Sequence, residues 1–315
     1  MMSSTSNLPK VGFIGLGVMG TPMSTHLSRA GYPLVVYDIR TELAVQLAAE
    51  LSNTSAATSP AEVAASSDII VTMLPNGEVV REVLCAEDGV YAGLRPGSLL
   101  LDTSSSEPWL TQQTAEEMRA KGCSVVDAPV SGAQHGAKTA TLVFMVGGDD
   151  ADVERVRPLL QCMGRAIYHL GGVGAGHAMK CLNNMITSMN LLALAEGLAV
   201  GTRYGLDPAV MTDVINESTG GSWVSKTHIH QRILNRAFDD PFKLELMVKD
   251  IGIGMELARQ TGVPVPLSAN GQHLWKAAAL AAGPGASVSE LVRWVEKLTG
   301  VTIESAKGPR APAAQ

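Results

Sequence analysis

The chain has 315 residues, and 46% of them are hydrophobic, which is enough for two domains with sizeable cores. A formal net charge of −6 argues against a nucleic acid partner, because binding to phosphates requires a clustered excess of lysine and arginine. Residues 1–10 are polar and no run of about 20 apolar residues follows, so we expect no signal peptide, no membrane segment and a cytoplasmic location.

Short apolar runs alternate with helical patterns through the first half of the chain, which is typical of a doubly wound parallel sheet with helices on both faces. Each apolar run is bounded by Gly, Pro, Asp or Ser, as expected of strands that are buried on both faces. The expected strands are residues 11–14, 33–37, 68–74, 98–101, 123–127 and 141–146. The helices expected between them are residues 22–30, 42–52, 60–65, 79–84, 109–121 and 151–162.

A glycine cluster at residues 171–176 ends this alternation, and strand patterns are absent from the sequence after it. Residues 174–302 are therefore expected to form an all-α C-terminal domain that begins with a long interdomain helix, residues 177–204. Apolar residues on nearly every face of that helix indicate burial between partners and self-association as a homodimer or homotetramer. The other expected helices are residues 208–216, 226–235, 244–261 and 287–298. The tail, residues 303–315, is expected to be disordered.

The first expected strand runs directly into a G-x-G-x-x-G motif, which consists of Gly15, Leu16, Gly17, Val18, Met19 and Gly20. Its glycines would allow a tight turn and the close approach of a pyrophosphate to the N-terminus of the next helix. Asp38 ends the second strand, where a carboxylate accepts hydrogen bonds from the ribose hydroxyls of adenosine. These features predict that residues 8–173 form a dinucleotide-binding Rossmann domain. The alternative is a plain glycine turn between a strand and a helix.

The carboxylate of Asp38 also bears on the choice of dinucleotide. It would repel the 2′-phosphate of NADP, so NAD is the expected cofactor. Arg40 follows two residues later and could turn toward a phosphate, which leaves NADP open as an alternative.

Three further motifs follow the glycine motif and Asp38 in the chain. They are DAPVSGA at residues 127–133, GAGHAMKCLNN at residues 174–184, and the pair Lys249-Asp250. Together, in this order and spacing, the motifs resemble those of the β-hydroxyacid dehydrogenases, in the 3-hydroxyisobutyrate dehydrogenase group. The resemblance covers residues 10–300 and implies a nicotinamide-dependent enzyme with a Rossmann domain and a helical domain.

The resemblance assigns the role of catalytic acid and base to Lys180. A lysine on a buried helix that faces a cleft has its pKa lowered by desolvation, so it could take up the hydroxyl proton of a substrate and return it. Asn184 lies one helical turn later on the same face and is implied to bind the substrate or to orient Lys180. The alternatives are a lysine that extends to the surface and an ordinary polar residue on a helix.

The resemblance also places the substrate carboxylate at Ser131 and Gly132. The serine hydroxyl and backbone N–H groups would hold the anion, and glycine would let it approach the main chain. Ala133 departs from the family, which often has a second glycine there. Alternatively, residues 129–136 are only a loop after a strand.

Four more residues are implied to contact the cofactor. They are Leu74, Pro75, Ser105 and Lys249. Family members usually carry threonine at the position of Ser105, and serine keeps the hydroxyl. Lys249 is expected to reach the nicotinamide end of the cofactor from the helical domain. Taken alone, Lys249-Asp250 is a charged dipeptide that is most often solvated on a helix.

No metal site is expected. The histidines at positions 135, 177, 228 and 230 have no accompanying H-E-x-x-H motif or carboxylate cluster. The four cysteines lack close C-x-x-C spacing and are expected to be reduced thiols.

The sequence thus predicts an NAD-dependent dehydrogenase that reversibly oxidises the 3-hydroxyl of a small β-hydroxy acid similar to 3-hydroxyisobutyrate. Two related activities stay open, namely NADP-linked semialdehyde reduction and imine reduction. A non-catalytic dinucleotide-binding module is an alternative of another class, although such a module has no need for the proton-transfer group of Lys180. The identity of the acid is left open by the sequence.

Overall fold

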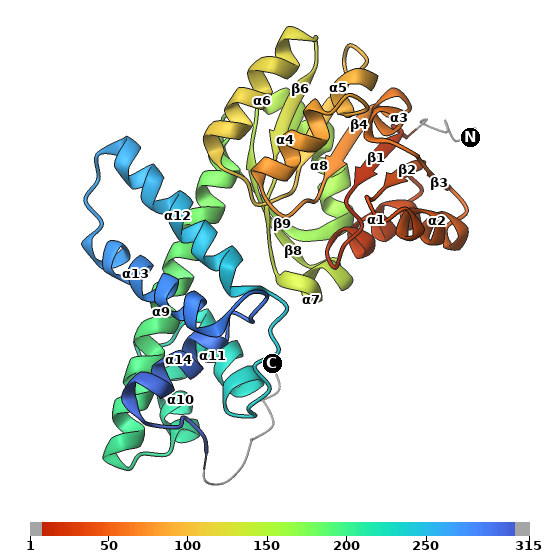
Figure 1. Ribbon diagram of the computed structural model, residues 1–315. Helices are drawn as coiled ribbons and strands as arrows, with labels where there is room; N and C mark the ends of the chain where they lie inside the picture. The colour runs from red at the N-terminus through yellow and green to blue at the C-terminus, as the bar shows by residue number, and fades with distance from the viewer. Residues whose placement is uncertain (1–7, 306–315) are drawn as a thin grey trace. The chain divides into compact units, whose positions relative to one another are not determined.

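The computed structural model describes residues 8–305, so most of the expected tail lies outside the described part of the chain. Contacts divide the chain into two compact units, and the division falls after Lys180, inside a long helix. The first unit contains the β-sheet, and the second is built from helices (Figure 1). The expected domain boundary at residues 173 and 174 lies just before the start of that helix.

The sheet of the first unit has nine strands among the described residues. They are β1 (Val11–Ile14), β2 (Leu34–Tyr37), β3 (Thr54–Ala56), β4 (Ile69–Thr72), β5 (Leu99–Asp102), β6 (Ser124–Asp127), β7 (Val130–Ser131), β8 (Leu142–Gly147) and β9 (Gly164–Gly171). The strand order is β3-β2-β1-β4-β5-β6-β8-β7, and β9 pairs with β8. The strands from β3 to β6 are parallel to one another, as the doubly wound pattern predicts.

The six expected strands are confirmed, with ends that shift by at most two residues. Two features correct the prediction. The strand β8 runs antiparallel to β6, so the sheet is not wholly parallel. In addition, β3, β7 and β9 were not predicted, because β3 is a polar Thr-Ser-Ala run, β7 has two residues, and β9 is mostly exposed or half-buried.

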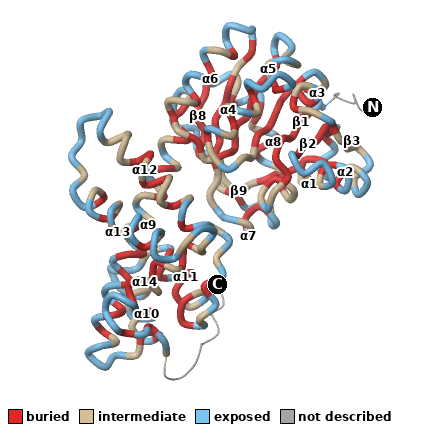
Figure 2. The backbone as a smooth tube through the Cα atoms, in the orientation of Figure 1, coloured by how far each residue is buried: buried red, intermediate tan, exposed pale blue. Residues whose placement is uncertain are grey.

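Alternate residues of the central strands enter two different cores, one on each face of the sheet. Phe13, Val36 and Leu101 belong to one core, and Ile14 and Leu100 belong to the other. Figure 2 shows the central strands β1, β4 and β5 in red because both faces are covered there. This explains why the strands appear in the sequence as continuous apolar runs.

Eight helices accompany the sheet in the described part of the first unit. They are α1 (Gly20–Arg29), α2 (Thr41–Glu50), α3 (Pro60–Ala65), α4 (Gly77–Cys85), α5 (Val90–Gly93), α6 (Pro108–Ala120), α7 (Ala133–Lys138) and α8 (Asp150–Met163). The six expected helices are confirmed to within two residues at each end. The short helices α5 and α7 were not predicted, because each has six residues or fewer and contains a glycine.

The second unit is helical, as predicted. Its elements are α9 (Ala175–Tyr204, which begins in the first unit), α10 (Pro208–Asn216), α11 (Trp223–His228), the π-helical turn η1 (Ile229–Ile233), α12 (Leu244–Thr261), α13 (Pro266–Ala282) and α14 (Glu290–Thr299). The helix expected at residues 226–235 is divided between α11 and η1. The prediction missed α13, many of whose apolar residues are alanines, although its Trp275 is fully buried in the core.

Among the described residues, α9 is the one helix long and apolar enough, by length and composition, to cross a membrane. Half of its most apolar window is buried inside the protein, as in a core helix. Leu198 is fully buried, whereas Ile186 and Val200 are 57% and 71% exposed. The expected burial on every face is therefore only partly realised within one chain.

Candidate active site

The loop between β1 and α1 has the shape that a dinucleotide pyrophosphate requires. Gly15 adopts φ +98°, and a Cβ on Gly20 would lie 1.9 Å from the Gly15 carbonyl oxygen, so the fold itself needs both glycines. At Gly17, by contrast, a Cβ would meet no atom within 4 Å. No side chain caps the N-terminus of α1, although the N–H groups of Thr21 and Met23 already donate to the carbonyl oxygens of Gly17 and Met19. The loop therefore fits the pyrophosphate of a dinucleotide.

The remaining members of the glycine motif differ in exposure. Leu16 is buried and Met19 is packed against the core, whereas Val18 is 57% exposed. The side chains of Leu16 and Met19 therefore support the loop from within, while Val18 borders the solvent side.

Asp38, one residue past β2, is fixed against this loop. Its Oδ2 accepts a hydrogen bond of 2.7 Å from the backbone N–H of Leu16, and its Oδ1 accepts one of 2.9 Å from the N–H of Arg40. The Arg40 side chain is mostly exposed, with its Nε 3.5 Å from Asp38 Oδ1. The buried carboxylate thus stands beside the glycine loop with lone pairs left for the ribose hydroxyls.

Leu74, Pro75 and Ser105 lie just past the carboxyl ends of β4 and β5, on the edge of the sheet where the glycine loop also lies. The N–H of Leu74 donates a hydrogen bond of 2.9 Å to Ser104 Oγ, which joins the two loops. Pro75 is exposed, and Leu74 and Ser105 are half-buried. In doubly wound sheets, cofactors bind at this edge.

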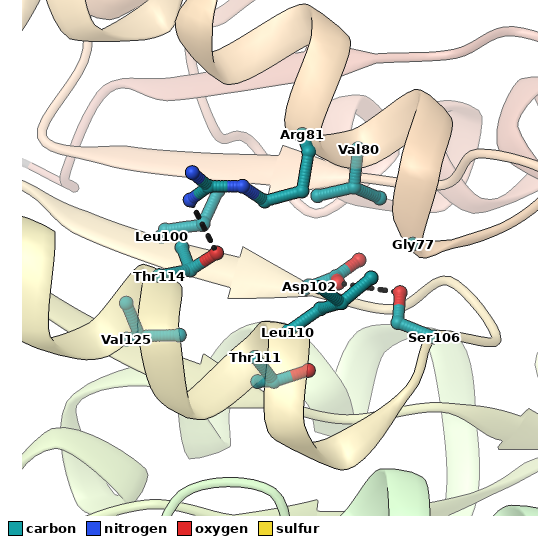
Figure 3. Close-up of a pocket in the computed structure, with 10 residues that line it drawn as sticks. All are labelled: Gly77, Val80, Arg81, Leu100, Asp102, Ser106, Leu110, Thr111, Thr114 and Val125. Carbon is teal, nitrogen blue, oxygen red and sulfur yellow. Dashed lines mark hydrogen bonds between the residues drawn. The ribbon is translucent and has the colours of Figure 1, made fainter. Parts of the chain in front are cut away.

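Three neighbouring strands end in polar residues that are paired in register. Thr72 of β4 pairs with Asp102 of β5, and Asp102 pairs with Asp127 of β6. The Asp102 carboxylate accepts hydrogen bonds from the hydroxyls of Thr72 (2.9 Å) and Ser106 (3.2 Å), the latter drawn in Figure 3. Beside it lies a cavity of about 10 Å³, which has room for one water molecule and is far too small for a cofactor.

Asp127 holds the N-terminus of α9. Its Oδ1 accepts a hydrogen bond of 2.7 Å from the N–H of Gly174, and its Oδ2 accepts one of 2.8 Å from the N–H of His177. Burial raises the pKa of Asp127 above its ordinary value, while His177 and the two N–H groups oppose this shift. A Cβ on Gly176 would lie 2.8 Å from Asp127 Oδ2 and 2.2 Å from the Met145 carbonyl oxygen, so only glycine fits there.

The His177 ring is fully buried beside this cap. Its Nδ1 lies 2.8 Å from Thr111 Oγ1, and its Nε2 lies 3.1 Å from the Ser104 carbonyl oxygen. Both Asp102 and Asp127 place a carboxylate oxygen 3.8 Å from the ring nitrogens. Sequence reasoning considered His177 only as a metal ligand and gave no role to either aspartate. The described residues contain no group of three or more potential metal ligands.

Lys180 lies one turn after His177 on α9 and is half-buried. The alternative for Lys180 was a side chain that extends to the surface, and a partly buried residue does not match it. Its burial is compatible with the expected acid and base role, because a lysine in that role must be accessible to a substrate and partly desolvated.

Ser131 and Gly132 form the turn from β7 into α7. The alternative, that residues 129–136 are only a loop, is incomplete because this segment contains β7 and the start of α7. Gly132 is exposed and adopts φ +128°. Ala133 follows with φ +49°, a conformation that costs an alanine roughly 1 kcal/mol or more. The residue at which the sequence departs from the family is therefore one where glycine would remove backbone strain.

In the second unit, Asn184 and Lys249 are joined through Asp250. Asn184 Nδ2 donates a hydrogen bond of 2.6 Å to Asp250 Oδ2, which links α9 to α12. Lys249 Nζ lies 3.2 Å from Asp250 Oδ1, and the carboxylate is fully buried. This pair is therefore not the solvated dipeptide of the alternative interpretation. The sequence analysis gave no role to Asp250.

Comparisons with known proteins agree with this geometry. Residues 10–171 match the NAD-binding domain of 6-phosphogluconate dehydrogenase, and residues 174–295 match the NAD-binding domain of NADP-dependent 3-hydroxyisobutyrate dehydrogenase. The chain is 34% identical to 2-(hydroxymethyl)glutarate dehydrogenase of Eubacterium barkeri, over 93% of this chain and 97% of that protein. The chain belongs to the β-hydroxyacid dehydrogenase family.

Other family members span different substrates. The NAD-dependent L-serine dehydrogenase of Pseudomonas aeruginosa is 34% identical over 85% of this chain and 92% of that protein. The structure of Mycobacterium tuberculosis 3-hydroxyisobutyrate dehydrogenase with L-serine superposes with a TM-score of 0.83 and 34% identity, covering 91% of this chain and 99% of that one. An imine reductase of Myxococcus stipitatus shares the fold at 20% identity, with a TM-score of 0.62 and coverage of 91% and 99%.

Membership of the family establishes three of the predictions. The first unit is a Rossmann domain, and the cofactor is a nicotinamide dinucleotide. The chain is an oxidoreductase of the class that acts on the hydroxyl groups of hydroxy acids. The glycine loop and Asp38 supply the geometry that such a cofactor needs.

Proposed function

We propose that the protein is an NAD-dependent dehydrogenase that reversibly oxidises the 3-hydroxyl of a small β-hydroxy acid, with Lys180 as the acid and base. The observation that carries this proposal is the half-buried Lys180, which lies one turn beyond a firmly capped helix N-terminus. A module that only bound a dinucleotide would have no use for an ammonium group held in this way.

In this mechanism, Ser131 and Gly132 bind the substrate carboxylate with a hydroxyl and backbone N–H groups. The bound nicotinamide supplies the acceptor for the hydride that leaves the carbon bearing the hydroxyl. During oxidation Lys180 Nζ takes the hydroxyl proton and passes it to solvent, and during reduction it returns a proton to the carbonyl oxygen. Asn184, fixed by Asp250, orients the lysine or the substrate from the next turn of α9.

The substrate class follows from chemistry that relatives share. The acids named for them, 3-hydroxyisobutyrate, L-serine and 2-(hydroxymethyl)glutarate, all have the form HOCH₂–CH(R)–COO⁻. They differ only in R, which is a methyl, an ammonium or a carboxyethyl group. We infer that the substrate of this chain has the same form, because the proposed contacts engage only the carboxylate and the hydroxyl.

NAD is the proposed dinucleotide. The Asp38 carboxylate is buried beside the glycine loop and would repel a 2′-phosphate, whereas it can accept hydrogen bonds from a ribose diol. An NADP-linked semialdehyde reductase is the second candidate, and its supporting observation is the exposed Arg40 near the same carboxylate. Imine reduction is supported only by similarity of fold.

We also propose that two or four copies of the chain associate through the second unit. Val200 and Tyr204 on α9 are 71% and 84% exposed, and Val210 and Val214 on α10 are 42% and 58% exposed. Apolar side chains at helical spacing on neighbouring helices are typical of a subunit interface.

The cytoplasmic location remains a prediction from the sequence.

The test of the proposed function is reduction of NAD or NADP, followed at 340 nm, with a panel of acids of the form HOCH₂–CH(R)–COO⁻ and with 2-hydroxy acids as controls. Lys180→Ala should lower turnover about 10²–10⁴-fold while NAD binding by calorimetry stays nearly unchanged. Lys276→Ala, on an exposed position of α13, is the matched control and should retain full turnover. Near-normal turnover of Lys180→Ala would refute the role of the lysine, and activity with cyclic imines alone would favour imine reduction.

A further inference from the structure

Two carboxylates lie side by side in the interior of the first unit. Asp102 and Asp127 end adjacent parallel strands in register and are 3% and 0% exposed. Two carboxyl groups at such positions lose their hydration, so each requires strong hydrogen-bond donors. The His177 ring lies 3.8 Å from each of the two carboxyl groups.

Both nitrogens of the His177 ring are hydrogen-bonded. Nε2 faces the Ser104 carbonyl oxygen, which can only accept. Nδ1 lies 2.8 Å from Thr111 Oγ1, and that hydroxyl also lies 3.1 Å from the Glu107 carbonyl oxygen. These contacts fix the ring between α6 and the loop after β5. The carboxyl groups beside the ring are those of Asp102 from β5 and Asp127 from β6, and α6 contributes the Thr111 hydroxyl.

The same cluster connects the parts of the proposed active site. Asp127 binds the backbone N–H groups of the first turn of α9, and Lys180 follows His177 by three residues, which makes them neighbours on the helix surface. Asp127 also precedes Ser131 by four residues. Ser104 precedes Ser105, and its carbonyl oxygen contacts the His177 ring. The Ser104 hydroxyl accepts a hydrogen bond from the N–H of Leu74.

We propose that His177, held between Asp102 and Asp127, is a positioning residue that fixes Lys180 relative to the cofactor loops and the Ser131 turn. This inference rests on the proposed function, because it assumes that Lys180 transfers the proton. A helix N-terminus is usually capped by its own chain neighbours. Here the cap comes from the end of a core strand, so the helix carrying Lys180 starts at a position set by the sheet.

The test uses His177→Gln and Asp127→Asn in the full-length enzyme, with His230→Gln as control, since His230 is also paired with an aspartate, Asp213. Both cluster variants should lose about 10-fold or more in kcat, while the Kd for NAD changes by less than about 2-fold. The pH profile of kcat/KM separates positioning from general damage. A displaced Lys180 should shift the acidic limb of that profile in both cluster variants, whereas His230→Gln should leave it unchanged.

A readout that needs no turnover is the nitrogen NMR spectrum of the His177 ring in the unmodified protein. A slowly exchanging N–H at Nε2, donated to the Ser104 carbonyl oxygen, is expected, and rapid exchange of that proton would overturn the proposal. Wild-type kcat and unshifted pH profiles in both variants, while Lys180→Ala is inactive, would also overturn it and leave the proposed function intact. If no acid is oxidised at all, the proposed function fails, and the NMR result still decides whether the ring is held by its hydrogen bond to Ser104.

Discussion

A single carboxylate, that of Asp38, should decide between the two dinucleotides. We expect Asp38→Asn to lower kcat/KM with NAD and to raise the ratio of NADP to NAD activity about 10-fold or more, because repulsion of the 2′-phosphate is removed and Arg40 is released from its partner. Steady-state kinetics with both dinucleotides measure this ratio. Glu42→Gln, an exposed acid on α2, is the control. An unchanged ratio in Asp38→Asn would argue against the role of the carboxylate.

At the scale of residues, the sequence predicted best where function depends on local order along the chain. Gly15, Gly17 and Asp38 could be predicted as cofactor residues because a short motif follows a strand and a carboxylate ends the next one. The roles of Asp127 and Asp250 were not found, because each bonds to residues about 50 or more positions away. Spacing carries no information about such contacts until the fold is known.

At the scale of elements, the helices α4, α5 and α6 are joined on one face of the sheet by a polar cluster. Arg81 of α4 makes two hydrogen bonds to Glu117 of α6, of 2.6 and 2.9 Å, and the Tyr91 hydroxyl of α5 donates one of 2.8 Å to the same carboxylate. Arg81 lowers the pKa of Glu117 to about 2. The folded state therefore binds this proton more weakly than the unfolded state does.

Glu117→Gln should consequently reduce stability in a pH-dependent way. The contribution of the carboxylate is fully present above the ordinary glutamate pKa of about 4.3 and is lost as the pH falls toward about 2. Because Glu117 is one-third exposed, we expect a loss of only about 1 kcal/mol at pH 7. Urea unfolding at pH 7 and at pH 3 measures the difference, with Glu116→Gln on the exposed side of α6 as control. An equal loss at both pH values would contradict the assignment.

Which elements could be predicted follows from their burial. Strands β1, β4 and β5 are buried at every position and appear as apolar runs. The outer strand β9 has no buried residue, so its pairing with β8 left no trace in its sequence. In the same way, α13 buries Trp275 but exposes Leu267 and Leu280, which obscures its apolar stripe.

At the scale of the whole molecule, the exposed apolar side chains of α9 and α10 lead to a prediction about mass. In light scattering the protein should show two or four times its chain mass of 33.0 kDa. Val200→Asp and Val214→Asp should lower that mass, because a charge in an apolar interface is costly to bury. Val45→Asp, an equally exposed valine on α2, should leave it unchanged. A wild-type mass of 33.0 kDa at all concentrations would contradict self-association.

Different physical constraints apply to the three glycines of the dinucleotide loop. Side chains at Gly15 and Gly20 would collide with backbone carbonyl groups, whereas one at Gly17 would meet only open space. The fold thus requires Gly15 and Gly20, whereas Gly17 is required only by the proposed dinucleotide. A descendant of this chain that gave up its cofactor but kept its fold would be free to change the middle glycine first, so the loss of that residue alone would mark the lineage in which catalysis had been abandoned.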